Sequence, residues 1–153
     1  MELKKFIVIL FLINFNNFSN AQTIKPANNL TAFDVVKIQL KALQNNGKLK
    51  NDLGIKQVWI FAHPNNKKVT GPYERFRIMI YGKQYNYLLD HNSHKINLLM
   101  NTKEKYIYRI EILTKNKKLF YYEWQVEKGS DNNCNNCWFT TAVSIPIDQG
   151  NTI

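Results

Sequence analysis

Apolar residues recur at helical spacing in three segments of the N-terminal half. The longest segment is 34–45. A second begins at residue 51 or 52 and runs to about 62, and Pro64 ends it because the residue before a proline avoids helical geometry. A third segment is 71–82, which starts with Gly-Pro and closes at a glycine. The pattern therefore predicts three helices.

Sequence signals mark both ends of the first predicted helix. Thr31 is followed three residues later by Asp34, as in a capping box, and Asn45-Asn46-Gly47 supplies a stop. The segment 85–94 is polar and aromatic without a clear period, so we expect a loop with at most one helical turn.

From Lys95 onward the apolar period changes to two, which is typical of strands. Short polar connections such as 115–118 favour antiparallel hairpins. Because helices and strands are segregated along the chain, we predict an α+β fold with three N-terminal helices packed on an antiparallel sheet of about four strands. The expected strands cover 96–101, 106–112, 120–126 and 138–145.

The hairpin centred on Asn116 predicts a register. Symmetric pairing places Tyr108 opposite Trp124 on a face that the helices must cover. The same register places Arg109 opposite Glu123 on the other face, where an exposed ion pair contributes only ~0.2 to 1 kcal/mol. We therefore expect an aromatic inner face and a charged outer face.

The first residues read as a secretory signal. Lys4 and Lys5 precede the apolar run 6–13, and small residues flank a cleavage site after Ala21. The run is shorter than the ~20 residues needed to cross a bilayer, so no membrane span is expected after cleavage. The predicted organisation is a signal peptide at 1–21, a short lead at 22–32, one domain at 33–147 and a tail at 148–153.

The chain has 21 Lys and Arg against 11 Asp and Glu, which gives a net charge of +10. Such a balance can indicate nucleic-acid binding, but export removes the usual nucleic-acid partners, so none is predicted. The interpretation is a bacterial protein of the periplasm or the extracellular space.

Cys134 and Cys137 form a Cys-x-x-Cys pattern in a chain bound for an oxidising compartment. A redox motif would sit at a helix start after a strand, whereas this pair lies in an Asn-rich turn before a strand. We therefore predict a local disulfide. A zinc site would need two further ligands, which only distant histidines could supply.

Three local patterns resemble a family of exported or organellar domains of bacteria and plants, known only as a domain of unknown function. They are 34–45, the segment 61–76 with its Thr-Gly-Pro-x-x-x-Phe motif, and Trp124 together with Cys137-Trp138. The resemblance implies a cone-like fold similar to the nuclear-transport-factor-2-like superfamily, with helices in the concave side of a curved sheet.

The family offers no established activity, so the resemblance implies no catalytic residues. The chain also departs from the pattern, with His63 where we expect Ser and Lys67 where we expect Arg. If this loop serves recognition, the ligand preference differs here.

Aromatic residues are the richest chemical feature of the chain. Tyrosine hydroxyls on an inward sheet face need partners, and a pocket is one way to provide them. By strand parity the inward face between Tyr106 and Val126 carries no carboxylate, which favours a non-enzymatic domain that binds a small molecule between sheet and helices, or an accessory domain. No cofactor is predicted. The predicted ligand-binding residues are Tyr73, Phe76, Tyr108, Tyr122, Trp124 and Trp138.

Two other functions stay open. A small hydrolase, isomerase or dehydratase could use His63, Asp90 or His91 as a base. His91 and His94 have a spacing that can pair two imidazoles, but no third ligand is apparent and no metal site is predicted. A homodimeric interaction module could use the apolar residues expected on the outer sheet face, which are Ile107, Leu113, Leu119 and Tyr121.

Overall fold

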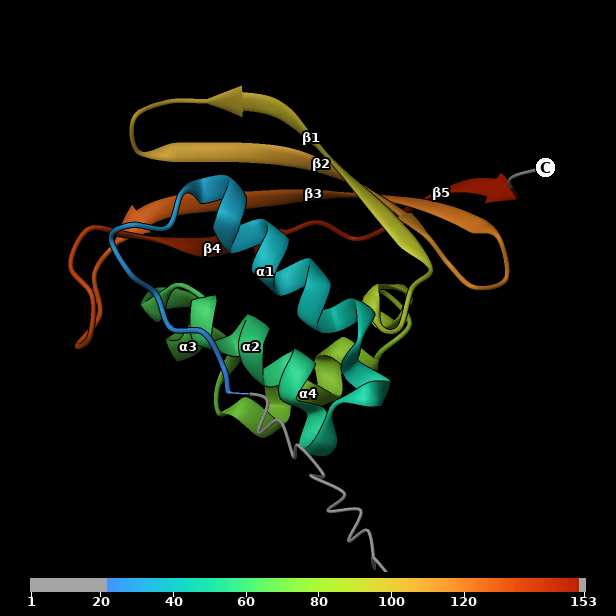
Figure 1. The fold of residues 1–153 in the computed structure, drawn as a ribbon, viewed down its shortest axis with the longest axis horizontal. Helices are drawn as coiled ribbons and strands as arrows, with labels where there is room; N and C mark the ends of the chain where they lie inside the picture. Colours follow the sequence, from blue (N-terminus) through green and yellow to red (C-terminus); the bar gives the residue numbers. More distant parts are fainter. Residues whose placement is uncertain (1–21, 152–153) are drawn as a thin grey trace, which may run out of the picture.

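The computed structural model describes residues 22–151, in which four α-helices precede an antiparallel sheet of five strands (Figure 1). The predicted signal peptide lies outside the described residues. The predicted α+β class is confirmed, and the helices lie on one side of the sheet. The helices are α1 (Ala32–Gln44), α2 (Leu53–Phe61), α3 (Pro64–Thr70) and α4 (Tyr73–Tyr81); the strands are β1 (Ser93–Asn101), β2 (Lys105–Leu113), β3 (Lys118–Gly129), β4 (Cys137–Val143) and β5 (Ile147–Asn151).

Helix α1 starts with the expected capping box, two residues earlier than predicted. The Asp34 amide donates to Thr31 Oγ1 at 3.1 Å, and the Thr31 amide donates to Asp34 Oδ2 at 2.9 Å. The Thr31 hydroxyl also donates to Asp34 Oδ2 at 2.6 Å. This bond is the main cause of the lowered pKa of the Asp34 carboxyl, followed by the bond from the Thr31 amide. The fully buried Val36 and Leu40 lie on the face of α1 that joins the core.

Helix α2 crosses α1 at very close range. A Cβ built on Gly54 would clash with the backbone oxygen of Ala42 in α1, so only glycine fits there. Just beside this crossing, Asn46 Oδ1 accepts a hydrogen bond from the Ile55 amide at 3.1 Å. The crossing fixes where the inner face of α2 meets the sheet.

The structure corrects the predicted helix count from three to four. Pro64 does follow the end of α2, but it also opens α3 at a position where its missing N–H costs nothing. His63 caps this helix, because its Nδ1 accepts from the Asn65 amide at 3.2 Å. The sequence pattern missed α3 because its residues are almost all polar and none is buried.

Helix α4 is tied to the start of α2 by Asp52. This carboxylate accepts from Arg77 Nε and from the Tyr81 hydroxyl, both at 2.6 Å, and from Asn46 Nδ2 at 3.1 Å. The hydrogen bond from Tyr81 is the largest cause of the lowered pKa of Asp52. The predicted third helix is thus present as α4, which begins two residues later and ends one residue earlier than the predicted segment 71–82.

The strands run in the order β1-β2-β3-β4, and β5 pairs with β3 as well. All pairings are antiparallel. The sheet has five strands rather than about four, because β5 occupies most of the segment for which the sequence predicts a tail. The residues of β5 are exposed and mostly polar, so no alternation of apolar and polar residues indicated a strand there.

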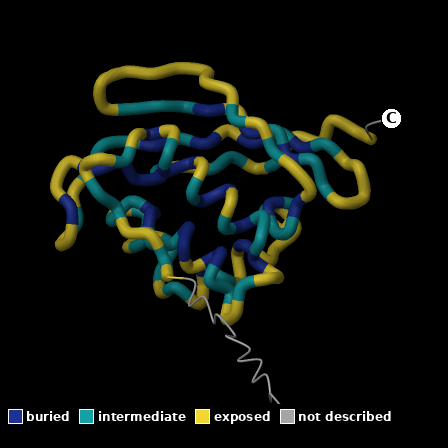
Figure 2. Tube along the Cα trace, in the orientation of Figure 1, coloured by how far each residue is buried: buried dark blue, intermediate teal, exposed yellow. Residues whose placement is uncertain are grey.

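The predicted register of β2 with β3 is confirmed in full. Tyr108 pairs with Trp124, and these side chains are 3% and 1% exposed. Arg109 pairs with Glu123, and both are exposed. In Figure 2 the buried positions gather in the middle of the sheet and on the helices beneath it, whereas the ends of the hairpins are exposed. The aromatic face therefore points toward the helices.

Strand β1 departs from the expected alternation. A bulge lies between Leu98 and Met100, and these two residues and Leu99 are all exposed. The hairpin of β1 and β2 extends past the start of α1 in Figure 1, so the helices do not cover its end.

The contact at Gly54 predicts an unusual result. Gly→Ala in a helix normally stabilises by about 1 kcal/mol, but Gly54→Ala should lower the free energy of unfolding by roughly 2 kcal/mol or more because backbone must shift. Urea unfolding measures the difference, with the exposed Lys56→Ala in α2 as the control. Equal or higher stability of Gly54→Ala would refute the close crossing.

Candidate functional site

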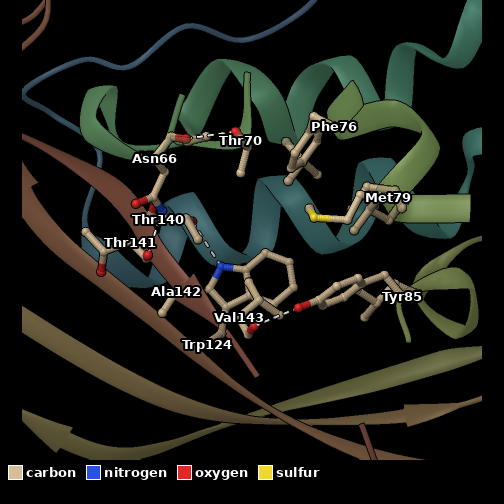
Figure 3. Close-up of a pocket in the computed structure, with 15 residues that line it drawn as sticks. Asn66, Thr70, Phe76, Met79, Tyr85, Trp124, Thr140, Thr141, Ala142 and Val143 are labelled. Carbon is tan, nitrogen blue, oxygen red and sulfur yellow. Dashed lines mark hydrogen bonds between the residues drawn. The ribbon is translucent and has the colours of Figure 1, made fainter. Parts of the chain in front are cut away.

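A cavity of about 210 Å³ lies between the helices and the inner face of β3 and β4 (Figure 3). Its lining is mainly apolar, and Met79 on α4 and Ala142 on β4 are exposed residues that mark its opening. The indole of Trp124 forms part of one wall. The full lining is Leu43, Val58, Ala62, Asn66, Thr70, Phe76, Met79, Ile80, Tyr85, Leu88, Trp124, Thr140, Thr141, Ala142 and Val143.

A buried hydrogen-bond network fixes this indole. Trp124 Nε1 donates to Gln39 Oε1 at 3.1 Å and to Thr140 Oγ1 at 3.0 Å. The Thr140 hydroxyl donates to the same Gln39 oxygen at 2.7 Å, and Gln39 Nε2 donates to the backbone oxygen of Val58 at 3.3 Å. The network therefore joins α1, α2, β3 and β4 at the edge of the cavity.

The polar groups of the opposite wall come from α3. Asn66 Nδ2 donates to the backbone oxygens of Thr140 and Thr141, at 3.3 and 2.5 Å, and so holds α3 against the edge of β4. The Thr70 hydroxyl donates to the backbone oxygen of Asn66 at 2.8 Å. At the other end, the Tyr85 hydroxyl donates to the backbone oxygen of Val143 at 3.2 Å. Figure 3 shows these groups around the cavity.

These bonds decide what the cavity can offer a ligand. The donors of Trp124, Thr70 and Tyr85 and the Asn66 amide group are all directed to protein acceptors, whereas Asn66 Oδ1 has no hydrogen bond within the described residues. Tyr85 is the one ionisable side chain in the described lining, and burial raises its pKa, so it stays neutral. The cavity is thus uncharged and largely apolar, and the N–H and O–H donors named here are already paired.

The structure distributes the predicted ligand-binding residues over several places. Phe76 and Trp124 line the cavity, and Tyr108 and Trp138 line a separate cleft. Tyr122 donates its hydroxyl to the backbone oxygen of Gln84 at 2.9 Å, and burial strongly raises its pKa.

Tyr73 lies outside both hollows. Its ring packs on Trp59 with centroids 6.2 Å apart, and its hydroxyl lies 3.4 Å from the backbone oxygen of Asp52. Sequence reasoning missed Asn66 and Thr70, although their spacing of four residues is that of one helix face.

The residues considered as catalytic bases lie outside the cavity. His63 caps α3, and its ring meets Phe139 edge-on at 6.1 Å. Asp90 has a left-handed backbone (φ 50°), and its Oδ1 accepts from the Gly47 amide at 2.7 Å. Asp90 and His91 line a different, polar basin at the end of α1.

His91 is buried and paired with His94. Its Nδ1 lies 2.7 Å from the backbone oxygen of Leu88, which makes Nδ1 the protonated nitrogen. Its Nε2 lies 2.7 Å from His94 Nδ1, which must then be the donor. Burial lowers the pKa of His91 to about 4, and burial followed by the charge of Lys41 lowers that of His94. Both rings are therefore neutral at pH 7.

Cys134 and Cys137 form the predicted disulfide, in the turn before β4. The Asn28 side chain lies against both sulfurs and donates to the backbone oxygen of Asn135 at 3.0 Å, which ties the N-terminal lead to this turn. Within residues 22–151, no group of three or more His, Cys, Asp or Glu side chains is arranged to hold a metal ion.

Comparison of the chain with protein-family models, with curated proteins and with solved structures found no match. No helix within residues 22–151 is long and apolar enough to cross a bilayer. The function must therefore be inferred from the geometry of the site.

The lowered pKa of His91 predicts loss of stability in acid. The unfolded chain takes up this proton near pH 6.5 and the folded protein only near pH 4, so stability falls as the pH falls through this window. This histidine alone should lower the free energy of unfolding by about 2 kcal/mol between pH 7 and pH 5.

Urea unfolding at both pH values tests this, because His91→Gln should reduce the difference by about 2 kcal/mol and His63→Gln should retain it. NMR titration of the imidazole carbons follows His91 in the unchanged protein. A His91 midpoint near 6.5 would contradict the prediction.

Proposed function

We propose that this protein binds a small uncharged molecule in the cavity between the helices and β3–β4. The observation that carries the proposal is an apolar hollow whose donors are already paired, while Asn66 Oδ1, on a residue of the lining, has no hydrogen bond within residues 22–151. Such a site fits a ligand with an apolar or aromatic body and one N–H or O–H group. At about 210 Å³ the cavity suits a molecule smaller than a typical drug.

The same lining favours binding over acid–base catalysis. Proton transfer needs a positioned acid or base whose pKa lies near the working pH. None of the described lining residues is Asp, Glu, His, Lys, Arg or Cys. The alternative hydrolase, isomerase or dehydratase would use His63, Asp90 or His91 as its base, but none of the three lines the cavity. Asp90 and His91 line the polar basin beside Lys41 and Lys115 instead.

Export to the periplasm or the extracellular space is part of the proposal. The apolar N-terminal run and the Cys134–Cys137 disulfide support it, since disulfides persist in oxidising compartments. The resemblance to the nuclear-transport-factor-2-like superfamily is likewise proposed, and helices packed on one face of an antiparallel sheet support it.

A homodimer is a second proposal, and the outer face of the sheet supports it. The described helices all lie on the other side, and Ile107, Leu113, Leu119 and Tyr121 are only half-buried. Sedimentation velocity at high protein concentration should show a dimer that Leu119→Lys dissociates. A monomer at all concentrations would end this proposal.

Indole is a suitable probe of the cavity, because it combines a planar apolar body with one N–H donor. At ~0.5 kcal/mol for each non-hydrogen atom, its dissociation constant should be about 1 mM or tighter. Chemical-shift changes in NMR spectra should map to Asn66, Phe76 and Trp124. Indene, which lacks the N–H group, should bind more weakly.

A matched pair of variants on α4 separates cavity binding from surface binding. Met79→Trp fills the opening and should abolish indole binding, whereas Ile78→Trp adds the same side chain at a neighbouring position outside the lining, where Ile78 is 67% exposed. Equal binding by the two variants, or no saturable binding by the wild type, would overturn the proposed function.

A further inference from the structure

A second hollow lies where α1 begins, beside the inner faces of β2 and β4. Its volume is about 300 Å³, and it shares no lining residue with the cavity. The N-terminal lead forms one side and three aromatic side chains of the sheet form the other. Its lining is Asn28, Asn29, Leu30, Thr31, Ala32, Phe33, Tyr106, Tyr108 and Trp138, and we call it the aromatic cleft.

The rings of the aromatic cleft support one another. Tyr106 meets Trp138 edge-on with centroids 5.2 Å apart and lies nearly parallel to Tyr108 at 6.0 Å. Phe33 meets Tyr108 edge-on at 6.3 Å, yet it is 44% exposed. Strands of the sheet carry the rings of Tyr106, Tyr108 and Trp138, whereas the Phe33 ring faces solvent at the rim of the cleft. An exposed ring next to a structured cleft suits contact with a ligand.

The hydroxyl groups of Tyr106 and Tyr108 make no hydrogen bond to any residue in the described part of the chain. For Tyr108 this is unusual, because the residue is 3% exposed, and the equally buried Tyr122 does donate its hydroxyl to Gln84. Every fully buried side-chain N or O atom among residues 22–151 has a partner, so the Tyr108 hydroxyl must reach the space of the cleft. Burial raises its pKa to about 12, which keeps the donor in place.

The rim of the aromatic cleft adds further polar groups without adding charge. The carboxamide of the exposed Asn29 has no hydrogen bond within the described residues, whereas Asn28 is held by the disulfide turn. The described lining contains no Asp, Glu, Lys, Arg or His. Lys128 is not part of this lining, although its ammonium lies 4.6 Å from the centroid of the Trp138 ring. An ionic ligand would therefore find no opposite charge on a lining residue.

We propose that the aromatic cleft binds a neutral sugar ring of a glycan, with its C–H face on Phe33 and Tyr106 and a ring hydroxyl accepting from Tyr108. A pyranose has an apolar face and a hydroxyl-rich edge, which matches rings combined with unpaired phenol and amide groups. A purely aliphatic ligand would leave the Tyr108 hydroxyl buried without a partner, at a cost of about 1 to 3 kcal/mol.

Isothermal titration calorimetry with three neutral hexasaccharides tests the proposal: cellohexaose, hexa-N-acetylchitohexaose and maltohexaose. At least one should bind the wild-type protein with a dissociation constant of about 1 mM or tighter. The probes differ in linkage and in acetamido groups, so their ranking also defines the sugar. Failure of all three would overturn the proposal.

Variants assign the binding to the cleft. Tyr108→Phe removes only the hydroxyl and should weaken binding roughly five- to tenfold. Its control is Tyr121→Phe on the outer face of the sheet, which should bind as the wild type does. Phe33→Ala should weaken binding roughly tenfold or more, with the exposed Ile78→Ala as its control.

Thermal unfolding separates a ligand contact from a structural role. Because the Tyr108 hydroxyl makes no hydrogen bond to any of the residues that the structure describes, Tyr108→Phe should leave the melting temperature unchanged or raise it. A clear fall in melting temperature, or sugar binding that Tyr108→Phe and Phe33→Ala leave intact, would refute the assignment.

Discussion

The arrangement of the core depends on the buried carboxamide of Gln39. It receives hydrogen bonds from Trp124 and Thr140 and donates to the backbone of Val58, so one side chain of α1 joins α2, β3 and β4. A buried polar network that is fully satisfied favours a single arrangement, because any shift would leave costly unpaired groups. The indole that it holds is also a wall of the cavity, so the same interaction that orders the core shapes the site.

The centre of the sheet could be predicted because two independent signals agree there. The turn around Asn116 sets the register of β2 with β3, and the alternating aromatic residues set the face, so Tyr108 and Trp124 point inward. In strands β1 and β5, the regular alternation of apolar and polar residues is missing. Strand β1 has three consecutive apolar residues and a bulge, and β5 has almost no apolar residue. Alternation cannot assign a face to either.

The site was only partly predictable, for a physical reason. Phe76 and Trp124 follow from the content of large aromatic residues, which must pack somewhere inside. Asn66 enters the cavity through a helix that Pro64 opens, and proline is an equally good signal for an end or a start. Which tyrosine hydroxyl finds a partner depends on backbone oxygens far away in sequence, such as that of Gln84. No local pattern contains that information.

The ligands proposed for the two hollows would have opposite chemistry, although one sheet supports both sites. Around the cavity the N–H and O–H donors of the protein already bond to protein oxygens, so a bound molecule would have to supply its own hydrogen-bond donor. In the aromatic cleft the hydroxyl of Tyr108 is a donor without a protein acceptor, so a bound molecule must bring oxygens. Because no lining residue is shared, one molecule cannot serve both sites through the same contacts. The groups without a hydrogen bond among the described residues, Asn66 Oδ1 and the Tyr108 hydroxyl, therefore distinguish the two proposed ligands more than the shape of either hollow does.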